Sequence, residues 1–358
     1  MTTMTSAGKS AARLHAEQTD RRRIIGYWLM LMCLMVFAMV VLGGVTRLTH
    51  SGLSMVEWKP ITGWLPPLTD AEWAETFAKY QQSPEYQKVN KGMSVDEFKS
   101  IFWFEFIHRV WGRLIGVAFF FPALFFVVKG WAGRALMPKL ALMFVLGGLQ
   151  GVLGWYMVKS GLVDRPDVSQ YRLTAHLGMA LLVYGYMFWV ALGLIFPPRA
   201  EQAARSGSGG GFAAFLVGFV FLTLLSGGFV AGLDAGFAYN TFPLMDGGLW
   251  PDDFFSMQPW WINMFEHIPT VQFDHRLLAE SVFVLVLVFW WRHRGSAATP
   301  RAGMAVNVLL LAMLVQVGLG IATLLLVVPV SIAAIHQAGA VVLLSAALWA
   351  TFELRQSN

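Results

Sequence analysis

The chain has 358 residues, of which 56% are hydrophobic and 13% are charged. Soluble domains carry about 25% charged residues, so the composition excludes a soluble globule, a disordered chain and a disulfide scaffold. The formal net charge is +5, but the basic residues lie at the edges of apolar runs. That placement is typical of membrane orientation and argues against a nucleic-acid partner. The single cysteine, Cys33, excludes an intrachain disulfide and covalent C-x-x-C-H haem attachment.

Eight apolar stretches are long enough to cross a bilayer as helices, since roughly 20 residues span its hydrocarbon core. They cover residues 24–46, 101–128, 138–158, 173–196, 212–233, 273–291, 303–327 and 330–352. The first is too long for a cleaved signal peptide and is predicted to be a permanent helix after a tail of residues 1–23. The sequence therefore predicts an all-α membrane protein with eight transmembrane helices.

The distribution of charge predicts the orientation of these helices. Lys and Arg gather in the tail 1–23 and in the links after the second, fourth and sixth stretches. Residues 234–266 instead contain five carboxylates and no Lys or Arg. Because cytoplasmic loops are enriched in Lys and Arg, both termini are predicted to be cytoplasmic.

The long outer connection 48–100 contains two helix N-cap signatures, Thr69-x-x-Glu72 and Ser94-x-x-Glu97. The second is predicted to open the second long helix outside the lipid. The first precedes Trp73, Phe77 and Tyr80 at helical spacing. These aromatic residues fit either a short helix on the membrane face or a helix packed on the protein itself.

The chain contains an internal repeat. The N-terminal half spans 24–200 with its outer loop, a Gly/Ser-rich linker spans 201–211, and the C-terminal half spans 212–358. Four pairs of motifs match in the same order: Gly43-Gly44 with Gly227-Gly228, Glu105-Phe106-Ile107-His108-Arg109 with Gln272-Phe273-Asp274-His275-Arg276, Gln150-x-x-x-Gly154 with Gln316-x-x-x-Gly320, and Ala175-His176 with Ile335-His336. Each half has four helices, so the copies share one orientation. They are predicted to form two tandem four-helix bundles related by a pseudo-two-fold axis along the membrane normal.

Four histidines lie inside predicted helices at repeat-related positions. They are His108 and His176 in the first half and His275 and His336 in the second. Each is near the outer end of a helix that runs inward, so all four are predicted at one depth. Polar residues in the membrane are costly and mark functional sites. Two imidazoles at one level in each half favour axial ligation of a haem over a proton relay or a structural hydrogen bond.

The halves differ at one acid. Glu105 precedes His108 by one helical turn, whereas Gln272 occupies the matching place. A carboxylate near a haem can accept a proton or stabilise positive charge, which an amide cannot do. Glu105 is therefore a candidate catalytic residue, and the alternative is a structural carboxylate paired with Arg109 or Arg113. Arg47, Arg109 and Arg276 lie near the outer boundary, where they fit either porphyrin propionates or interfacial anchoring.

With these residues in view, the chain resembles the haem A synthase family over essentially all eight helices. The motifs that carry the resemblance are Thr46-Arg47-Leu48-Thr49-His50-Ser51-Gly52-Leu53-Ser54, Glu57-Trp58-Lys59-Pro60-Ile61-Thr62-Gly63, Glu105-Phe106-Ile107-His108-Arg109, Thr174-Ala175-His176, Asn240-Thr241-Phe242-Pro243-Leu244-Met245 and Phe273-Asp274-His275-Arg276. The first block resembles the proteobacterial and mitochondrial branch. The resemblance implies oxidation of a methyl substituent of haem O to a formyl group, by stepwise hydroxylation, to supply haem A for cytochrome oxidase assembly.

The resemblance also implies ligand sets. His275 and His336, with Arg276, hold a non-covalent bis-His haem b cofactor. The haem O substrate binds at His108 and His176, with Arg47 and Arg109, beside the essential carboxylate Glu105. The outer-loop cysteine pair of some relatives is absent, which excludes a thiol-based redox role.

The implied location is the bacterial inner membrane, with the haem sites toward the periplasm. The implied partners are the haem O and haem A porphyrins, the lipid bilayer, haem O synthase and an unnamed electron donor, and a homo-oligomer stays open. The alternative function is a di-haem b-type electron carrier of the cytochrome b561 or quinol-oxidising type. A haem transporter or chaperone built on the same repeat is a third hypothesis.

Overall fold

The computed structural model describes residues 6–59, 62–162, 168–197, 209–295 and 299–357. These residues form helices and no named strand. The long helices are α1 (Ser6–Leu48), α4 (Val95–Val128), α5 (Met137–Gly161), α6 (Gln170–Ile195), α7 (Gly209–Gly232), α9 (Ile268–His293), α10 (Pro300–Leu325) and α11 (Val330–Ser357). The short helices are α2 (Asp70–Gln81), α3 (Pro84–Lys88), α8 (Asn263–Glu266) and the 3₁₀ turns Ala235–Phe237 and Trp260–Ile262. Most of the predicted linker, 201–208, lies outside the described residues.

Seven helices of the described chain are long and apolar enough to cross a membrane: α1 (from Ala16), α4, α5, α6, α7, α10 and α11. This fits a multi-pass membrane protein. The predicted span 273–291 lies in α9, which is not among the seven. Every 18-residue stretch of α9 contains at least three acidic or basic side chains, drawn from Asp274, Arg276, Glu280 and Arg292.

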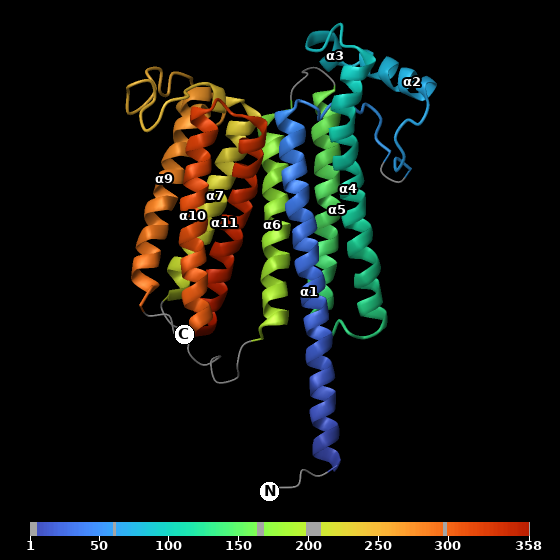
Figure 1. Ribbon diagram of the computed structural model, residues 1–358, viewed down its shortest axis with the longest axis vertical. Helices are drawn as coiled ribbons and strands as arrows, with labels where there is room; N and C mark the ends of the chain where they lie inside the picture. Colours follow the sequence, from blue (N-terminus) through green and yellow to red (C-terminus); the bar gives the residue numbers. More distant parts are fainter. Residues whose placement is uncertain (1–5, 60–61, 163–167, 198–208, 296–298, 358) are drawn as a thin grey trace.

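The long helices stand side by side and contact one another in a regular pattern (Figure 1). Among helices α1 to α6, α1 contacts α4 and α6, and α5 contacts α6. Among helices α7 to α11, α7 contacts α9 and α11, and α10 contacts α11. The two sets meet through α1, α6, α7 and α11. Buried apolar residues of these four helices, such as Leu29, Leu181, Val220 and Val341, belong to one hydrophobic core.

The outer connection folds onto the end of α4. Both predicted capping boxes are confirmed, at Thr69 for α2 and at Ser94 for α4. The predicted aromatic residues Trp73, Phe77 and Tyr80 of α2 are buried and pack on Phe98, Phe102 and Phe106 of α4. Of the two interpretations for α2, packing on the protein is therefore the one observed.

Candidate functional site

Each of the four helix histidines packs against a glycine of a neighbouring helix. A Cβ atom added at Gly43 of α1 would stand 3.3 Å from His108 Nε2, and one added at Gly154 of α5 would stand 3.1 Å from His176 Cε1. The repeat-related pairs behave alike. A Cβ atom added at Gly227 would stand 3.2 Å from His275 Cε1, and one added at Gly320 would stand 2.9 Å from His336 Cε1. Any larger residue at these four positions would push against an imidazole. The matched glycines thus fix where the rings lie.

Hydrogen bonds orient three of the rings. Ser226 Oγ lies 2.7 Å from Nδ1 of His275, which leaves Nε2 for another partner. The side-chain nitrogen of Gln316 donates to the backbone oxygen of His336 (3.0 Å) and lies 3.1 Å from its Nδ1.

A glutamine also holds the histidine of the first half, although its ring contact is with Nε2 of His176 (3.4 Å) and not with Nδ1. Gln150 donates to the backbone oxygen of His176 at 2.9 Å, and the repeat-related glutamines therefore hold repeat-related histidines. The Nδ1 atom of His176 is buried and has no hydrogen-bond partner among the described residues.

The histidines form two pairs. His108 lies within electrostatic range of His176, and His275 within range of His336. His176 and His336 each follow the first residue of their helix by six positions, which is about 9 Å of helix. No group of three or more His, Cys, Asp or Glu side chains that could hold a bare metal ion occurs in the described ranges. Two imidazoles suit the two axial positions of a haem iron, whose other four ligands come from the porphyrin.

Glu105 lies at the centre of a hydrogen-bond network beside the first pair. The residue is 2% exposed. Its Oε2 accepts hydrogen bonds from Ser54 Oγ (2.8 Å) and the Met55 amide (2.7 Å), and its Oε1 is ion-paired with Arg109. An ionised carboxylate satisfies all three donors, and burial without such partners would be costly.

The loop contacts of Arg109 recur in the second half at Arg276, where the neighbouring residue is the uncharged Gln272. Arg109 donates to the backbone oxygens of Met55 and Glu57, both at 2.8 Å. Arg276 donates to those of Tyr239 (2.8 Å) and Thr241 (3.0 Å), again two residues apart. Both arginines therefore clamp the loop that follows the first helix of their half.

Gln272 occupies the position that matches Glu105. It is 3% exposed. Its side-chain nitrogen donates to the Tyr239 carbonyl at 3.1 Å, and its Oε1 accepts a hydrogen bond from Arg276 at 3.5 Å, as Glu105 Oε1 does from Arg109.

Arg47 joins the outer ends of two helices. Its Nη2 pairs with Asp234 at 2.9 Å, and its Nη1 lies 3.3 Å from His50 Nδ1. His50 and Asp234 occupy equivalent positions after α1 and α7, and both have a left-handed backbone, with φ of 49° and 53°. The Nε atoms of Arg47 and Arg276 are buried and find no hydrogen-bond partner within the described part of the chain. Each can still donate to a carboxylate of a ligand.

Sequence reasoning identified the histidines, Glu105 and the arginines, and it missed the residues that hold them. Ser226 and Asp234 are the main omissions. Ser54 stood in a family motif, but its contact with Glu105 was not predicted. The order of the repeat offered one signal, since Gln150 and Gln316 already stood out as matched residues.

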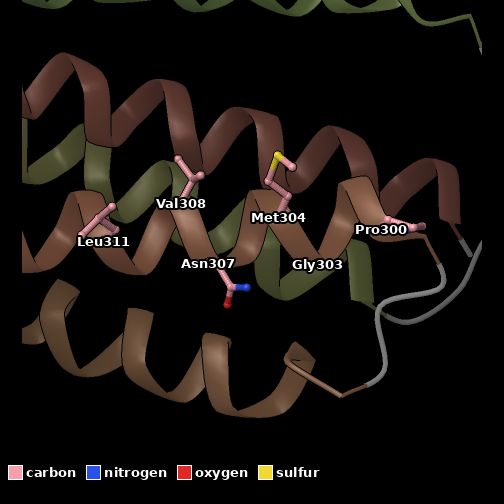
Figure 2. Close-up of a pocket in the computed structure, with 6 residues that line it drawn as sticks. All are labelled: Pro300, Gly303, Met304, Asn307, Val308 and Leu311. Carbon is pink, nitrogen blue, oxygen red and sulfur yellow. The ribbon is translucent and has the colours of Figure 1, made fainter.

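A surface groove of about 520 Å³ lies elsewhere, on α10. Its lining residues are Pro300, Gly303, Met304, Asn307, Val308 and Leu311 (Figure 2). Asn307 points toward the neighbouring α9, where it accepts a hydrogen bond from Trp290 at 2.9 Å. The groove occupies the half of α10 that precedes Gln316 and Gly320, so it does not include the histidine site.

Comparisons with known proteins agree over nearly the whole chain. A family model described as cytochrome oxidase assembly protein (COX15-CtaA) matches residues 26–348. A heme A synthase of Nitrosospira multiformis is 54% identical over 95% of this chain and 97% of its own length. One from Paramagnetospirillum magneticum is 52% identical over 98% and 99% of the two chains. The Bos taurus protein named heme A synthase COX15 is 45% identical over 98% of this chain and 86% of its own.

Proposed function

The chain belongs to the haem A synthase family, and from that premise we propose that it oxidises a methyl substituent of haem O to a formyl group. The protein is then an oxidoreductase that supplies haem A for cytochrome oxidase assembly. The observation that carries this function is the near full-length identity with named haem A synthases. The two histidine pairs, of which only one has a buried carboxylate next to it, fit that activity.

The proposed architecture is two four-helix bundles, residues 24–200 and 212–358, related by a pseudo-two-fold axis along the membrane normal. The first consists of α1, α4, α5 and α6, and the second of α7, α9, α10 and α11. The matched contacts between helices support this arrangement, and so do the matched glycine–histidine contacts. In this proposal α9 is the eighth span, and its charged outer end carries Asp274 and Arg276.

The second bundle holds a haem b between His275 and His336. The hydrogen bond between His275 Nδ1 and Ser226 Oγ supports this assignment, because a metal-bound imidazole donates its other ring N–H to a partner and the Ser226 hydroxyl itself donates to the Thr223 carbonyl. When bound, haem b supplies a one-electron carrier within the same membrane domain. Arg276 offers its unpartnered Nε to a propionate, while its Nη atoms remain on the loop carbonyls.

The first bundle receives haem O between His108 and His176. The buried, unpartnered Nδ1 of His176 fits a site that is completed by a ligand. Arg47 offers its Nε to a propionate of the substrate, and its pair with Asp234 holds the guanidinium in place. Arg109 already uses both Nη atoms on Glu105 and on loop carbonyls. Its contribution to substrate binding is therefore to shape the loop beside the ring.

Glu105 is the catalytic carboxylate in this proposal. As electrons leave the substrate methyl group, positive charge develops at the ring edge, and a fixed carboxylate in a buried site stabilises that charge. To accept a proton at Oε2, Glu105 would have to give up the Met55 or Ser54 hydrogen bond. The geometry therefore favours charge stabilisation as its first role. Proton acceptance requires the Ser54 hydroxyl to turn toward the Ile101 carbonyl, which lies 3.4 Å from Ser54 Oγ.

The proposed location is the bacterial inner membrane, with both termini in the cytoplasm and the haem sites near the periplasmic face. The five carboxylates of 234–266 and the basic inner links support this orientation. The cytoplasmic tail 1–23 continues the first span as helix from Ser6. Haem O synthase and an electron donor are the proposed partners, and a homo-oligomer is compatible with the site.

Pigment extraction tests the function directly. Protein expressed together with a source of haem O should co-purify with haem A and with hydroxylated haem O intermediates. Recovery of haem b alone, with and without that source, would instead support the alternative function, a di-haem electron carrier. The presence of Glu105 in one half only argues against the carrier, because electron transfer alone needs no such acid.

A further inference from the structure

One inward-facing position of α5 is open space in the first half. Gly147 lies on the helix face that also carries the buried Met143 and the His176 contacts Gln150 and Gly154. Residues on such a face normally pack on a neighbouring helix. Gly147 is nevertheless exposed, and no described atom comes within 4 Å of a Cβ added there.

Helix α4 has the same feature. Gly116 shares a face with Glu105, His108 and the buried Phe119, yet it is exposed, and a Cβ added to it meets no described atom within 4 Å. Gly116 follows His108 by eight residues, about 12 Å along its helix. Gly147 precedes Gly154, which touches His176, by seven residues, about 10 Å. The two open positions thus lie at one depth, on the cytoplasmic side of the histidines.

The second half fills the equivalent space. With His108 matched to His275, Gly116 corresponds to Phe283, which packs against the core. With Gln150 matched to Gln316, Gly147 corresponds to Met313, which is 2% exposed. The two halves therefore have equivalent histidine pairs but differ in the space on the cytoplasmic side of them. That space is open in the first half, and the side chains of Phe283 and Met313 occupy it in the second.

A second difference between the two halves lies at the histidines. The buried Nδ1 of His176 has no hydrogen-bond partner among the described residues, whereas Nδ1 of His336 lies 3.1 Å from the side-chain nitrogen of Gln316. The Oε1 atoms of Gln150 and Gln316 are unpartnered in both halves. Gln150 follows Gly147 by one helical turn, and His176 packs on the same face of α5 at Gly154. Buried polar atoms are rarely left without a partner in a complete structure. The unpartnered Nδ1 of His176 therefore distinguishes the first half at the outer end of this space.

We propose that the space beside Gly116 and Gly147 receives the isoprenoid tail of haem O, an inference that rests on the function proposed above. Haem O and haem b share one macrocycle, and haem O alone carries a long farnesyl-derived apolar tail. A tail that leaves the ring at the histidines and runs toward the membrane centre meets this gap in the first half. In the second half it meets Phe283 and Met313. These four positions determine which porphyrin each half accepts.

The test transfers the second-half residue to the first half. Purified Gly147→Met protein that retains its haem b is titrated with haem O and, separately, with added haem B, which lacks the tail. The wild type should bind haem O more tightly than haem B. The variant should bind haem O about tenfold more weakly or worse, because the added side chain occupies the tail space. Its affinity for haem B should stay within about twofold of the wild type.

Gly148→Met is the matched control. Gly148 also has open space around it, but it shares the outward face of α5 with the exposed Val145 and Val152. Its affinities for both porphyrins should equal those of the wild type. Equal losses for haem O and haem B in Gly147→Met, or no loss for either, would overturn the tail site and leave the proposed function intact. A wild type that binds neither porphyrin in its first half would overturn both.

The reciprocal variant is independent of the stability of Gly147→Met. Met313→Gly opens the matching space in the second half. Protein of this variant made with a haem O source should carry haem O or haem A in both halves. A second half that still contains haem b alone would count against Met313 as a determinant of specificity.

Discussion

Replacing Glu105 by glutamine gives the first half the residue of the second. The change is nearly isosteric, but a glutamine has one acceptor oxygen where Glu105 uses two for the three donors Ser54, Met55 and Arg109. Whichever way the amide turns, its NH₂ group faces a donor that has lost its acceptor. Because the Arg109 and Glu105 side chains are 7% and 3% exposed, removing the charge of one partner of this buried ion pair costs about 3–5 kcal/mol. Arg109 keeps two backbone carbonyls, and a domain stable by about 5–15 kcal/mol tolerates that loss.

The functional cost should be larger. Loss of the fixed negative charge, or of a proton acceptor, should lower product formation about 100-fold or more. The b-type spectrum should persist, because His275 and His336 belong to the other set of helices. The assay is haem A production in membranes or detergent, with the absorbance spectrum of the same sample recorded as a check on the cofactor.

Glu353→Gln is the control for loss of an ion pair to a buried carboxylate. Glu353 is 4% exposed and pairs at 2.5 Å with Arg301, whose side chain is 44% exposed, at the C-terminal end of α11. This variant should keep its activity, at a smaller cost in stability because Arg301 stays partly solvated. Full activity in Glu105→Gln would refute the catalytic role, and loss of the b-type spectrum would show that Glu105 acts through the fold of both halves.

Three further predictions address the supports of the site. Gly320→Ala should disturb or remove the b-type spectrum, because its Cβ would stand 2.9 Å from the His336 ring; Gly318→Ala, with no described atom within 4 Å, should not. Trp73→Ala should detach α2 and lower the unfolding free energy by about 3–5 kcal/mol, seen as faster amide exchange in the outer connection; unchanged exchange would contradict the packing. The pKa of Glu57 is lowered by hydrogen bonds from two lysines, so its stabilising effect is present at neutral pH and fades as pH falls through the lowered pKa. Glu57→Gln should lower the free energy of unfolding at pH 7 by less than about 1 kcal/mol, because its ion pairs with Lys59 and Lys79 are exposed. The change is followed as a slightly lower Tm, and a difference that persists in strong acid would contradict it.

The helices and their caps could be predicted from sequence because the signals are local. Apolar runs of about 20 residues and the Thr69 and Ser94 capping boxes each depend on neighbours within a few positions. The start of α1 at Ser6 was not predicted, because the polar segment before residue 24 carries no apolar pattern. The repeat, an ordered set of short motifs, led to the histidines and to the Glu105–Gln272 difference.

The contacts that hold the site could not be predicted, because they join helices far apart in the sequence. Asp234 meets Arg47 across 187 residues, and Ser226 meets His275 across 49. Which residues meet depends on the rotation of each helix about its axis and on its packing depth, and no local pattern reports either. The role of a glycine was equally hard to predict. Gly147 and Gly154 lie on the same helix, yet Gly154 packs against His176 and Gly147 faces open space.

The central claim is that the two histidine pairs hold different porphyrins, and paired variants test it most directly. His275→Ala and His108→Ala proteins, each made with a haem O source, are purified, and their pigments are extracted and identified. The account predicts that His275→Ala lacks haem b, whereas His108→Ala keeps haem b and lacks haem O and haem A. The same pigment loss in both variants, or loss of haem b from His108→Ala alone, would contradict it.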